Sequence, residues 1–401
     1  MIRSKKIILG LFVICVLVVA NVTFAAPASL KVIMGLGEDE WKVMRSDILP
    51  GFESKYNVKV EAYQAESQDT VKILQSRIMA KKMDIDVFSQ DNMNLAPFVE
   101  NKLVEDLTAY KSMIPATALK PLIANGTFGG KIFFMPYRPN VEITYYNSKK
   151  FAEFGLKPPA NWDELLAVAK AFKEKEGVGR VGIKLNLGPD SACHAFDFIR
   201  AAGGDPVVLN DAGCVKAFTY LQQLYPYLAP DSKTATWDTM NKMVATESAY
   251  IGANWPFGVN VIVKDGGKKE ILAYHGWAGP ARESHVLGGE MLGIPKGSPN
   301  KKLALKFIEY LLSKEVQEKL VSKMGWPASR TDAYGKVEEW QKPYFQAVND
   351  ALKFAEARPN LVYWDAVQKA VNEALREVVI EQRPVKDTLD KWHNYIEQNK
   401  R

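Results

Sequence analysis

The segment that decides the fold is LKVIMGLG, residues 30–37, an apolar run that ends in a glycine turn. It predicts a buried strand that leads directly into an acidic helix start at residues 38–40. The alternating segment NVKVEAYQ (57–64) predicts a second strand, and after a helix over 70–82 the segment DIDVFSQD (84–91) predicts a third. Because strands and helices alternate, the sequence predicts an α/β lobe with a largely parallel sheet.

The pattern changes after this first lobe. Residues 131–147 form an extended run interrupted by prolines, and a helix follows that Asn161 or Asp163 can cap. VGIKLN (181–186) predicts another strand, and a largely helical second lobe comes after it. Residues 301–323 have the apolar stripe of one strongly amphipathic helix. The sequence has no internal repeats, and no linker is long enough to separate the two lobes. We therefore expect the chain to cross between the lobes more than once.

The N-terminus has the three-part pattern of a secretory signal. MIRSKK is followed by an apolar run over residues 7–20 and then by small and polar residues. The run is short for a membrane span, so we expect cleavage after Ala25 or Ala26, with an uncleaved anchor as the alternative. Cys15 is preceded by isoleucine where a lipoprotein signal has a small residue, which disfavours lipid attachment there. The sequence therefore predicts an exported, soluble protein.

Composition excludes several functional classes. The chain has 401 residues, 47% hydrophobic and 24% charged, as expected for a globular protein with two lobes. Its formal net charge is +6, but the first 25 residues contribute three basic side chains and no acidic one. The remainder is too weakly basic for a strongly basic nucleic-acid binder. Aromatic residues reach 11%, with nine tryptophans, and the question is what they are for.

Two cysteines remain outside the signal, Cys193 and Cys214. An even pair in an exported protein favours a disulfide, and the alternative is two buried thiols. No CxxC motif is present, so the sequence indicates neither zinc nor thioredoxin-like chemistry.

Four groups of segments, in this order and spacing, resemble one known family. They are DIDVFSQDN (84–92), residues 129–165, GGEMLGIPKGSPNKKLALKFIEYLLSKEVQEKL (288–320) with GWPASR (325–330), and ARPNLVYWDAVQKAVNEAL (357–375) with RPVKDTLDKWHNYI (383–396). The chain resembles the extracellular solute-binding proteins of ABC importers, in particular the sugar-binding branch that includes maltose- and trehalose-binding proteins. The resemblance extends over roughly residues 30–400.

The resemblance implies an α/β protein of the type II periplasmic binding protein fold, with two α/β lobes joined by a multi-crossing hinge. We expect crossings near residues 136–139, 277–286 and 326–331, where prolines and glycines gather. The expected division is a signal peptide at 1–25, an N-terminal lobe of 26–137 plus 286–328, a C-terminal lobe of 138–276 plus 331–401, and hinge crossings at 277–285 and 329–330. Closure of such a hinge traps a ligand.

A sugar site needs aromatic platforms for the C–H faces and planar polar groups for the hydroxyls. Trp255 and Trp364 lie at expected loop or element ends, and the resemblance places Trp364 where relatives stack a tryptophan on a sugar. Trp277 lies near a joint, as does Trp326. The alternative for each tryptophan is ordinary core packing.

The polar candidates lie mostly at strand ends, where open α/β sheets bind ligands. Asp91 matches an acidic ligand-contacting position of the family, Arg330 matches a family arginine near the cleft, and Asn140 and Glu290 depart from the usual acid and aromatic. For the two acids of the first loop, the alternative is stabilisation of a helix N-terminus. The polar candidates are Glu38, Glu40, Asp91, Asn92, Arg138, Asn140, Glu290 and Arg330.

The sequence therefore predicts the substrate-binding component of an ABC importer, which captures a neutral mono- or oligosaccharide and delivers it to membrane permease subunits. Arg138 and Arg330 keep an anionic or polar solute, such as a glycerol phosphate compound, as an alternative. A periplasmic glycan-processing enzyme and a sensor for a membrane kinase are further alternatives. GxSxG, P-loop and HExxH motifs are absent. The histidines lack metal-site spacing, so we expect no metal and no cofactor, no nucleic acid partner, and a monomer.

Overall fold

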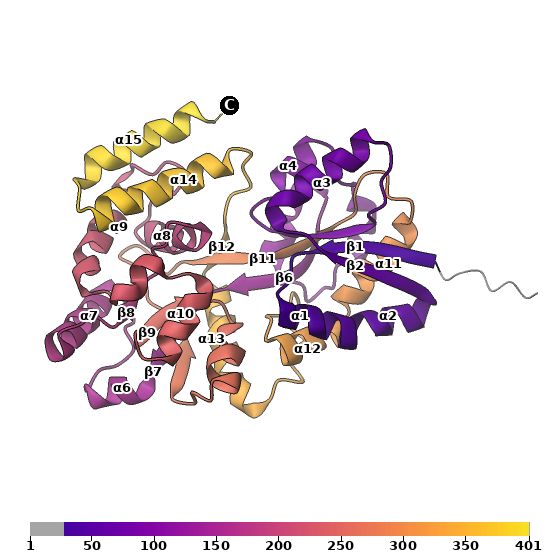
Figure 1. Ribbon diagram of the computed structural model, residues 1–401. Coiled ribbons are helices and arrows are strands. Elements are labelled where there is room, and N and C mark those ends of the chain that lie inside the picture. Colours follow the sequence, from indigo (N-terminus) through magenta and orange to yellow (C-terminus); the bar gives the residue numbers. More distant parts are fainter. Residues whose placement is uncertain (1–27, 401) are drawn as a thin grey trace, which may run out of the picture.

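The computed structural model describes residues 28–400, and the predicted signal peptide lies outside this range. Two bodies lie side by side and are bridged by the long strands β6 (Met135–Val141) and β11 (His285–Gly293) (Figure 1). Within residues 28–400, no helix combines the length and apolarity that crossing a bilayer requires. The two α/β bodies confirm the predicted fold class.

The first lobe is built on a sheet of six strands. β1 (Ala28–Met34) pairs in parallel with β2 (Val58–Gln64) and β3 (Val87–Asp91), as the alternating sequence pattern predicted. β11 pairs antiparallel with β3 and β6, and in parallel with β12 (Ala355–Ala357). A strand from late in the chain thus lies alongside β3, which sequence alternation does not predict.

The second lobe is built on a four-stranded sheet in the order β10 (Ile271–Tyr274), β7 (Ile143–Asn147), β9 (Ile251–Asn254) and β8 (Val181–Gly182). β7 is antiparallel to both of its neighbours, and β8 is parallel to β9. A hairpin of β4 (Thr127–Phe128) and β5 (Lys131–Ile132) precedes β6. The exact lobe boundaries and hinge crossings given above stay a prediction.

Helices cover both sheets (Figure 1). In the first lobe they are α1 (Glu38–Val43), α2 (Leu49–Tyr56), α3 (Ser67–Met79), α4 (Ala96–Glu100), α5 (Lys120–Asn125), α11 (Lys301–Leu312) and α12 (Lys314–Lys319). In the second they are α6 (Ser148–Glu153), α7 (Trp162–Glu176), α8 (Pro189–Ala201), α9 (Ala212–Leu224), α10 (Trp237–Ala245), α13 (Lys342–Leu352), α14 (Trp364–Ala374) and α15 (Val385–Gln398).

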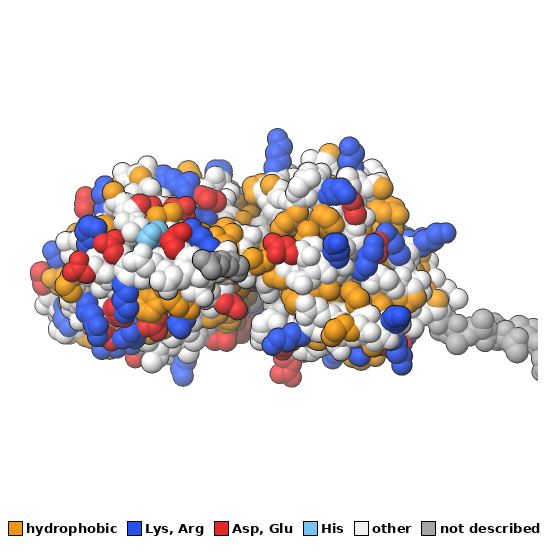
Figure 2. Space-filling model, turned by 90° about the horizontal axis from the view of Figure 1, so that it is seen from above, with side chains coloured by type: hydrophobic (Ala, Val, Ile, Leu, Met, Phe, Trp, Pro, Cys, Tyr) orange, Lys and Arg blue, Asp and Glu red, His pale blue; other side chains and the backbone are white. Residues whose placement is uncertain are grey.

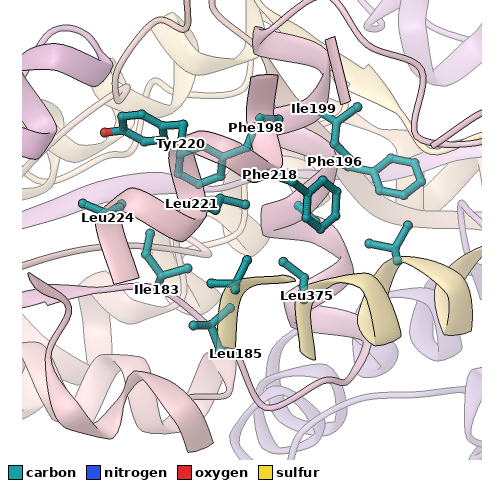
Figure 3. Close-up of a cluster of buried hydrophobic side chains, with 14 of the residues drawn as sticks. Ile183, Leu185, Phe196, Phe198, Ile199, Phe218, Tyr220, Leu221, Leu224 and Leu375 are labelled. Atoms are coloured by element: carbon teal, nitrogen blue, oxygen red, sulfur yellow. The ribbon is translucent and has the colours of Figure 1, made fainter. Parts of the chain in front are cut away.

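Each lobe has its own apolar core. In the second lobe, side chains from α8, α9 and the segment after β8 meet Leu375, which follows α14 (Figure 3). Phe196 and Phe218 are fully buried there, and burial of a side chain of this size contributes about 1.5–3 kcal/mol. On the face seen in Figure 2, acidic and basic side chains are interspersed over both bodies. The C-terminal helices α14 and α15 thus complete the core of the second lobe.

Two local predictions have different outcomes. Asn161 caps α7, because its Oδ1 accepts a hydrogen bond of 3.0 Å from the backbone N–H of Glu164. The single helix predicted over 301–323 is wrong. Ser313 ends α11 in an extended conformation and caps α12 by accepting from the Val316 N–H at 3.4 Å. The apolar stripe continues through the break, which is why the pattern conceals it.

The predicted disulfide is also wrong, because Cys193 and Cys214 are separate buried thiols. Cys193 Sγ accepts a hydrogen bond from Arg358 Nη1 at 3.2 Å, whereas Cys214 Sγ donates to the carbonyl of Asp205 at 3.4 Å. The two side chains therefore serve different neighbours. Burial raises the pKa of the Cys193 thiol to about 12 and raises that of Cys214 as well, which keeps both thiols protonated.

Candidate functional site

The candidate site begins as a row of polar residues across three strands of the first sheet. Glu290 of β11 lies opposite Asp91 of β3 on one side and opposite Arg138 of β6 on the other. Directly opposed residues in antiparallel strands point to the same face of a sheet. Two residues further along, Gly288 lies opposite Asn140 on that same face. The strand register thus gathers four predicted site residues that are up to 199 positions apart in the sequence.

Arg138 is the centre of an ion-pair network in this row. Its Nη1 lies 3.1 Å from Glu40 Oε1, and its Nη2 lies 3.4 Å from Glu290 Oε1. The guanidinium also stacks on Trp326, with Cζ 4.0 Å from the ring centroid. The Trp326 Nε1–H donates to the same Glu40 oxygen at 2.6 Å. Two carboxylates and an aromatic face therefore hold this arginine in one orientation.

Glu40 also caps the N-terminus of α1. Its Oε2 accepts a hydrogen bond of 2.8 Å from the backbone N–H of Gly37, which stabilises the start of the helix. The helix-terminal alternative considered for Glu40 is therefore present together with its contact to Arg138. Glu38, by contrast, is exposed. It borders an open hollow of about 830 Å³ next to Trp41 of the same helix and Arg45 of the turn that follows it.

Burial changes the ionisation of the row. It raises the pKa of Glu290 to about 7, because desolvation and the nearby negative charges of Glu40 and Asp91 outweigh the attraction of Arg138. Burial alone would lower the pKa of Arg138, but Glu290 and Glu40 reverse this effect and raise it. Ser89 Oγ donates to the other Glu290 oxygen at 3.2 Å. Near neutral pH, Glu290 can therefore either donate or accept a hydrogen bond.

Asp91 is tied to an arginine that our sequence analysis did not name as a site residue. Arg358 Nη2 lies 3.4 Å from Asp91 Oδ1, which also accepts the backbone N–H of Met93 at 2.9 Å. The side chain of Arg358 is only 4% exposed, and its Cζ lies 5.9 Å from the ring centroid of Trp364. The available signal was its place in the ARPN segment directly before the predicted aromatic residue.

Trp255 brings the second lobe to the same row. Its Cη2 lies 2.9 Å from the position that a Cβ on Gly288 would occupy, so the indole is in contact with the bare backbone of β11. Asn140 lies beside it, with its Cβ 3.6 Å from that same position. The absence of a side chain at residue 288 thus lets an aromatic ring and an amide lie next to each other where the lobes meet.

The other aromatic candidates are placed differently. Trp364 begins α14, is 5% exposed and packs on Phe196, with ring centroids 5.5 Å apart. Its Nε1–H has no hydrogen-bond partner within the described residues. Trp277 is half-buried in the β10–β11 connection and lines a small cavity together with Trp162. Trp364 is therefore close to the row through Arg358, while Trp277 borders the core of the second lobe.

Asn92 and Arg330 have structural partners. Asn92 is fully buried, and its Nδ2 donates to the carbonyl of Leu287 at 3.0 Å. Arg330 makes a two-point pair with Asp332, in which Nε and Nη2 lie 2.6 and 2.9 Å from the carboxylate oxygens. Its Nη1 donates to the carbonyl of Leu312 at the end of α11. Asn92 thus connects the end of β3 to β11, and Arg330 binds the C-terminal end of α11.

Comparisons with known proteins identify a family model and relatives that match much of the chain. The family model described as "Bacterial extracellular solute-binding protein" matches residues 49–347. A "Probable ABC transporter-binding protein" of Deinococcus radiodurans is 26% identical over 351 residues, which are 80% of this chain and 81% of the relative. A "Multiple sugar-binding protein" of Streptococcus mutans is 25% identical over 50% of this chain and 51% of its own length.

Solved structures share the fold at low sequence identity. The maltose-bound MalE3 of T. maritima superimposes with a TM-score of 0.80 and 21% identity, over 92% of this chain and 99% of its own. A solute-binding protein of Thermotoga lettingae bound to α-D-tagatose has a TM-score of 0.80 and 22% identity, over 93% and 100% of the two chains. MalE of Xanthomonas citri reaches 0.81 with 18% identity, over 93% and 97%.

Proposed function

Since the chain belongs to the bacterial extracellular solute-binding protein family, we propose that it captures a carbohydrate between its two lobes and delivers it to the permease of an ABC importer. The observation that carries the proposal is the polar row of Asp91, Glu290, Arg138 and Asn140 with Trp255 beside it. Carboxylate, guanidinium and amide groups bind hydroxyls, and an indole face binds the apolar side of a sugar ring.

The charges of the row favour a neutral ligand. Arg138 is already paired with two carboxylates, Arg358 with Asp91, and Arg330 with Asp332. An anionic ligand would have to displace a bound carboxylate from one of these arginines and leave that carboxylate unpaired. This cost counts against the glycerol phosphate alternative, whereas a sugar hydroxyl can join the existing hydrogen-bond network without breaking an ion pair.

Further parts of the proposal rest on the family and on the sequence. We infer an exported protein that loses residues 1–25, acts as a monomer, needs no cofactor and performs no catalysis. Trp255 and Trp364 are proposed to stack on the sugar after the lobes close. The proposed division into lobes, with hinge crossings at 277–285 and 329–330, supplies the movement that exposes these buried rings to an entering ligand.

A thermal-shift screen tests the ligand class. The mature chain is heated with mono-, di- and oligosaccharides, with glycerol phosphate compounds and with polyamines. A ligand bound only by the folded state raises the melting temperature, so we expect at least one sugar to shift it in a concentration-dependent way. A shift by an anionic compound while every sugar is inert would overturn the proposal. Release of reducing ends from a bound oligosaccharide would instead support the glycan-processing alternative.

A further inference from the structure

A second cluster of functional groups lies in the β10–β11 connection, away from the polar row. His275 directly follows β10, Glu283 lies in the connecting loop, and His285 is the first residue of β11. Glu283 Oε1 lies 2.5 Å from His275 Nδ1 and 2.8 Å from His285 Nε2. One carboxylate oxygen is therefore shared by two imidazoles that the sequence separates by ten residues.

The position of this cluster gives it a structural consequence. β10 belongs to the four-stranded sheet of the second lobe and β11 to the six-stranded sheet of the first. The backbone N–H of His285 donates to the carbonyl of Phe354 at 3.2 Å, which anchors the start of β11. The cluster thus joins the end of one sheet to the start of the other, within a segment where the sequence predicts a hinge crossing.

The ligand set and its spacing fit a divalent transition metal. Two imidazole nitrogens and one carboxylate are a common set for Zn²⁺, with a fourth position left to water. The three ligand atoms all lie within 4.8 Å of one another. Ligand atoms about 2.0–2.1 Å from a tetrahedral ion lie about 3.3 Å apart, so each imidazole nitrogen would lie less than about 1 Å farther from Glu283 Oε1 than it does here.

The burial of these side chains and the charges around them also favour a bound divalent metal ion. The side chains of Glu283 and His285 are 12% and 8% exposed, whereas that of His275 is 38% exposed and leaves a path from solvent. Arg282 is directed to Glu356 at 2.8 Å and so does not occupy this carboxylate.

The other histidines of the described chain offer a contrast. His194 is buried and bound to Glu142, and His393 Nδ1 lies 2.8 Å from the backbone carbonyl of Val208. The prediction of no metal rested on the spacing of the histidines in the sequence, which does not show that His275 and His285 meet in the fold. We propose that His275 Nδ1, Glu283 Oε1 and His285 Nε2 form a zinc site that clamps the two ends of the β10–β11 connection.

Titration calorimetry with ZnCl₂ tests the site in the mature chain, prepared without a histidine tag and treated with a chelator. We expect one Zn²⁺ per chain, a higher melting temperature with Zn²⁺, and intense visible absorption when Co²⁺ replaces it. H275Q, E283Q and H285Q should each weaken Zn²⁺ binding at least tenfold. The matched control H393Q removes a histidine from another part of the chain and should bind Zn²⁺ as the unchanged protein does.

Two results would overturn the site. One is the absence of saturable, one-to-one Zn²⁺ binding by the unchanged protein, which would leave the three residues as a hydrogen-bonded cluster. The other is Zn²⁺ binding that H275Q and E283Q retain at full affinity, which would place the ion elsewhere. Because His275 is partly exposed, H275Q is expected to fold. Zn²⁺ binding by H275Q therefore tests the site even if H285Q is unstable.

Discussion

A buried charge cluster beside Trp255 leads to the most specific stability prediction. Glu142, between β6 and β7, has a side chain that is 2% exposed and pairs with Lys184 Nζ, which is fully buried. His194 Nε2 lies 2.7 Å from the other Glu142 oxygen, and Lys184 Nζ donates to Asn254 Oδ1 at 3.3 Å. Glu142→Gln keeps the shape of the side chain and removes the charge, which leaves Lys184 buried without a counter-ion.

Two estimates of the magnitude agree. Removing one partner of a buried ion pair costs about 3–5 kcal/mol, because the remaining charge is uncompensated. Independently, burial would raise the pKa of Glu142, but Lys184 and His194 outweigh it and lower the pKa from 4.5 to about 2. A shift of this size corresponds to about 3 kcal/mol. We expect Glu142→Gln to lower the free energy of unfolding by this order of magnitude at pH 7.

The sign of the pH dependence follows from the same shift. The folded pKa lies below the unfolded one, so the stabilisation is fully present above about pH 4.5 and is lost as the pH falls towards 2. Urea unfolding between pH 7 and pH 3 should therefore show a smaller loss of stability for Glu142→Gln than for the unchanged protein. Burial and Lys184 lower the pKa of His194, so protonation of this imidazole also disfavours the folded state as the pH falls.

A surface pair and a double variant serve as controls. Glu153→Gln breaks an ion pair with Lys150 in which the glutamate is 55% exposed, and should cost less than about 1 kcal/mol. Glu142→Gln combined with Lys184→Met removes both charges and should be more stable than Glu142→Gln alone. The reasoning fails if Glu142→Gln costs no more than the surface control, or if its acid sensitivity equals that of the unchanged protein.

Three further predictions concern the site and the cysteines. Gly288→Ala places a Cβ 2.9 Å from the Trp255 ring and should lower the affinity for the sugar about tenfold in titration calorimetry. An unchanged affinity would show that this contact is not part of the binding site. Arg330→Lys loses its two-point ion pair and should cost about 1 kcal/mol in urea unfolding, while a loss of sugar affinity as well would assign it to the site. Cys193 and Cys214 should both react with a thiol reagent after denaturation, and a reductant should leave the melting temperature unchanged. If neither cysteine reacts until a reductant is added, the two form a disulfide after all.

Local sequence patterns predicted the parts of the fold that local forces build. The alternation of apolar and polar residues located β2 to within one residue of its observed bounds, and Asn161, one of two capping candidates, marks the start of α7. Each depends on residues a few positions apart, where side-chain periodicity and backbone capping act directly. The break at Ser313 was missed because the same apolar stripe serves two consecutive helices.

The sequence located several site residues singly but not their partners. Asp91 was found at the end of a predicted strand, whereas its contact with Arg358 joins residues 267 positions apart. The pairing of Arg138 with Glu290 depends on the register of β6 against β11, and no local pattern encodes that register. The disulfide prediction failed for the same reason, since cysteine spacing does not give the direction in which each thiol points.

The sequence by itself determined an α/β first lobe through its hydrophobic periodicity, and the resemblance to a known family, carried by an ordered set of segments along nearly the whole length, implied two α/β lobes. Only the tertiary structure decided which charges meet. β11 returns from late in the chain to lie between β3 and β6, and the β10–β11 connection brings His275 to His285. Such meetings depend on chain reversals and strand register, which are decided by burial summed over a whole lobe rather than by neighbouring residues.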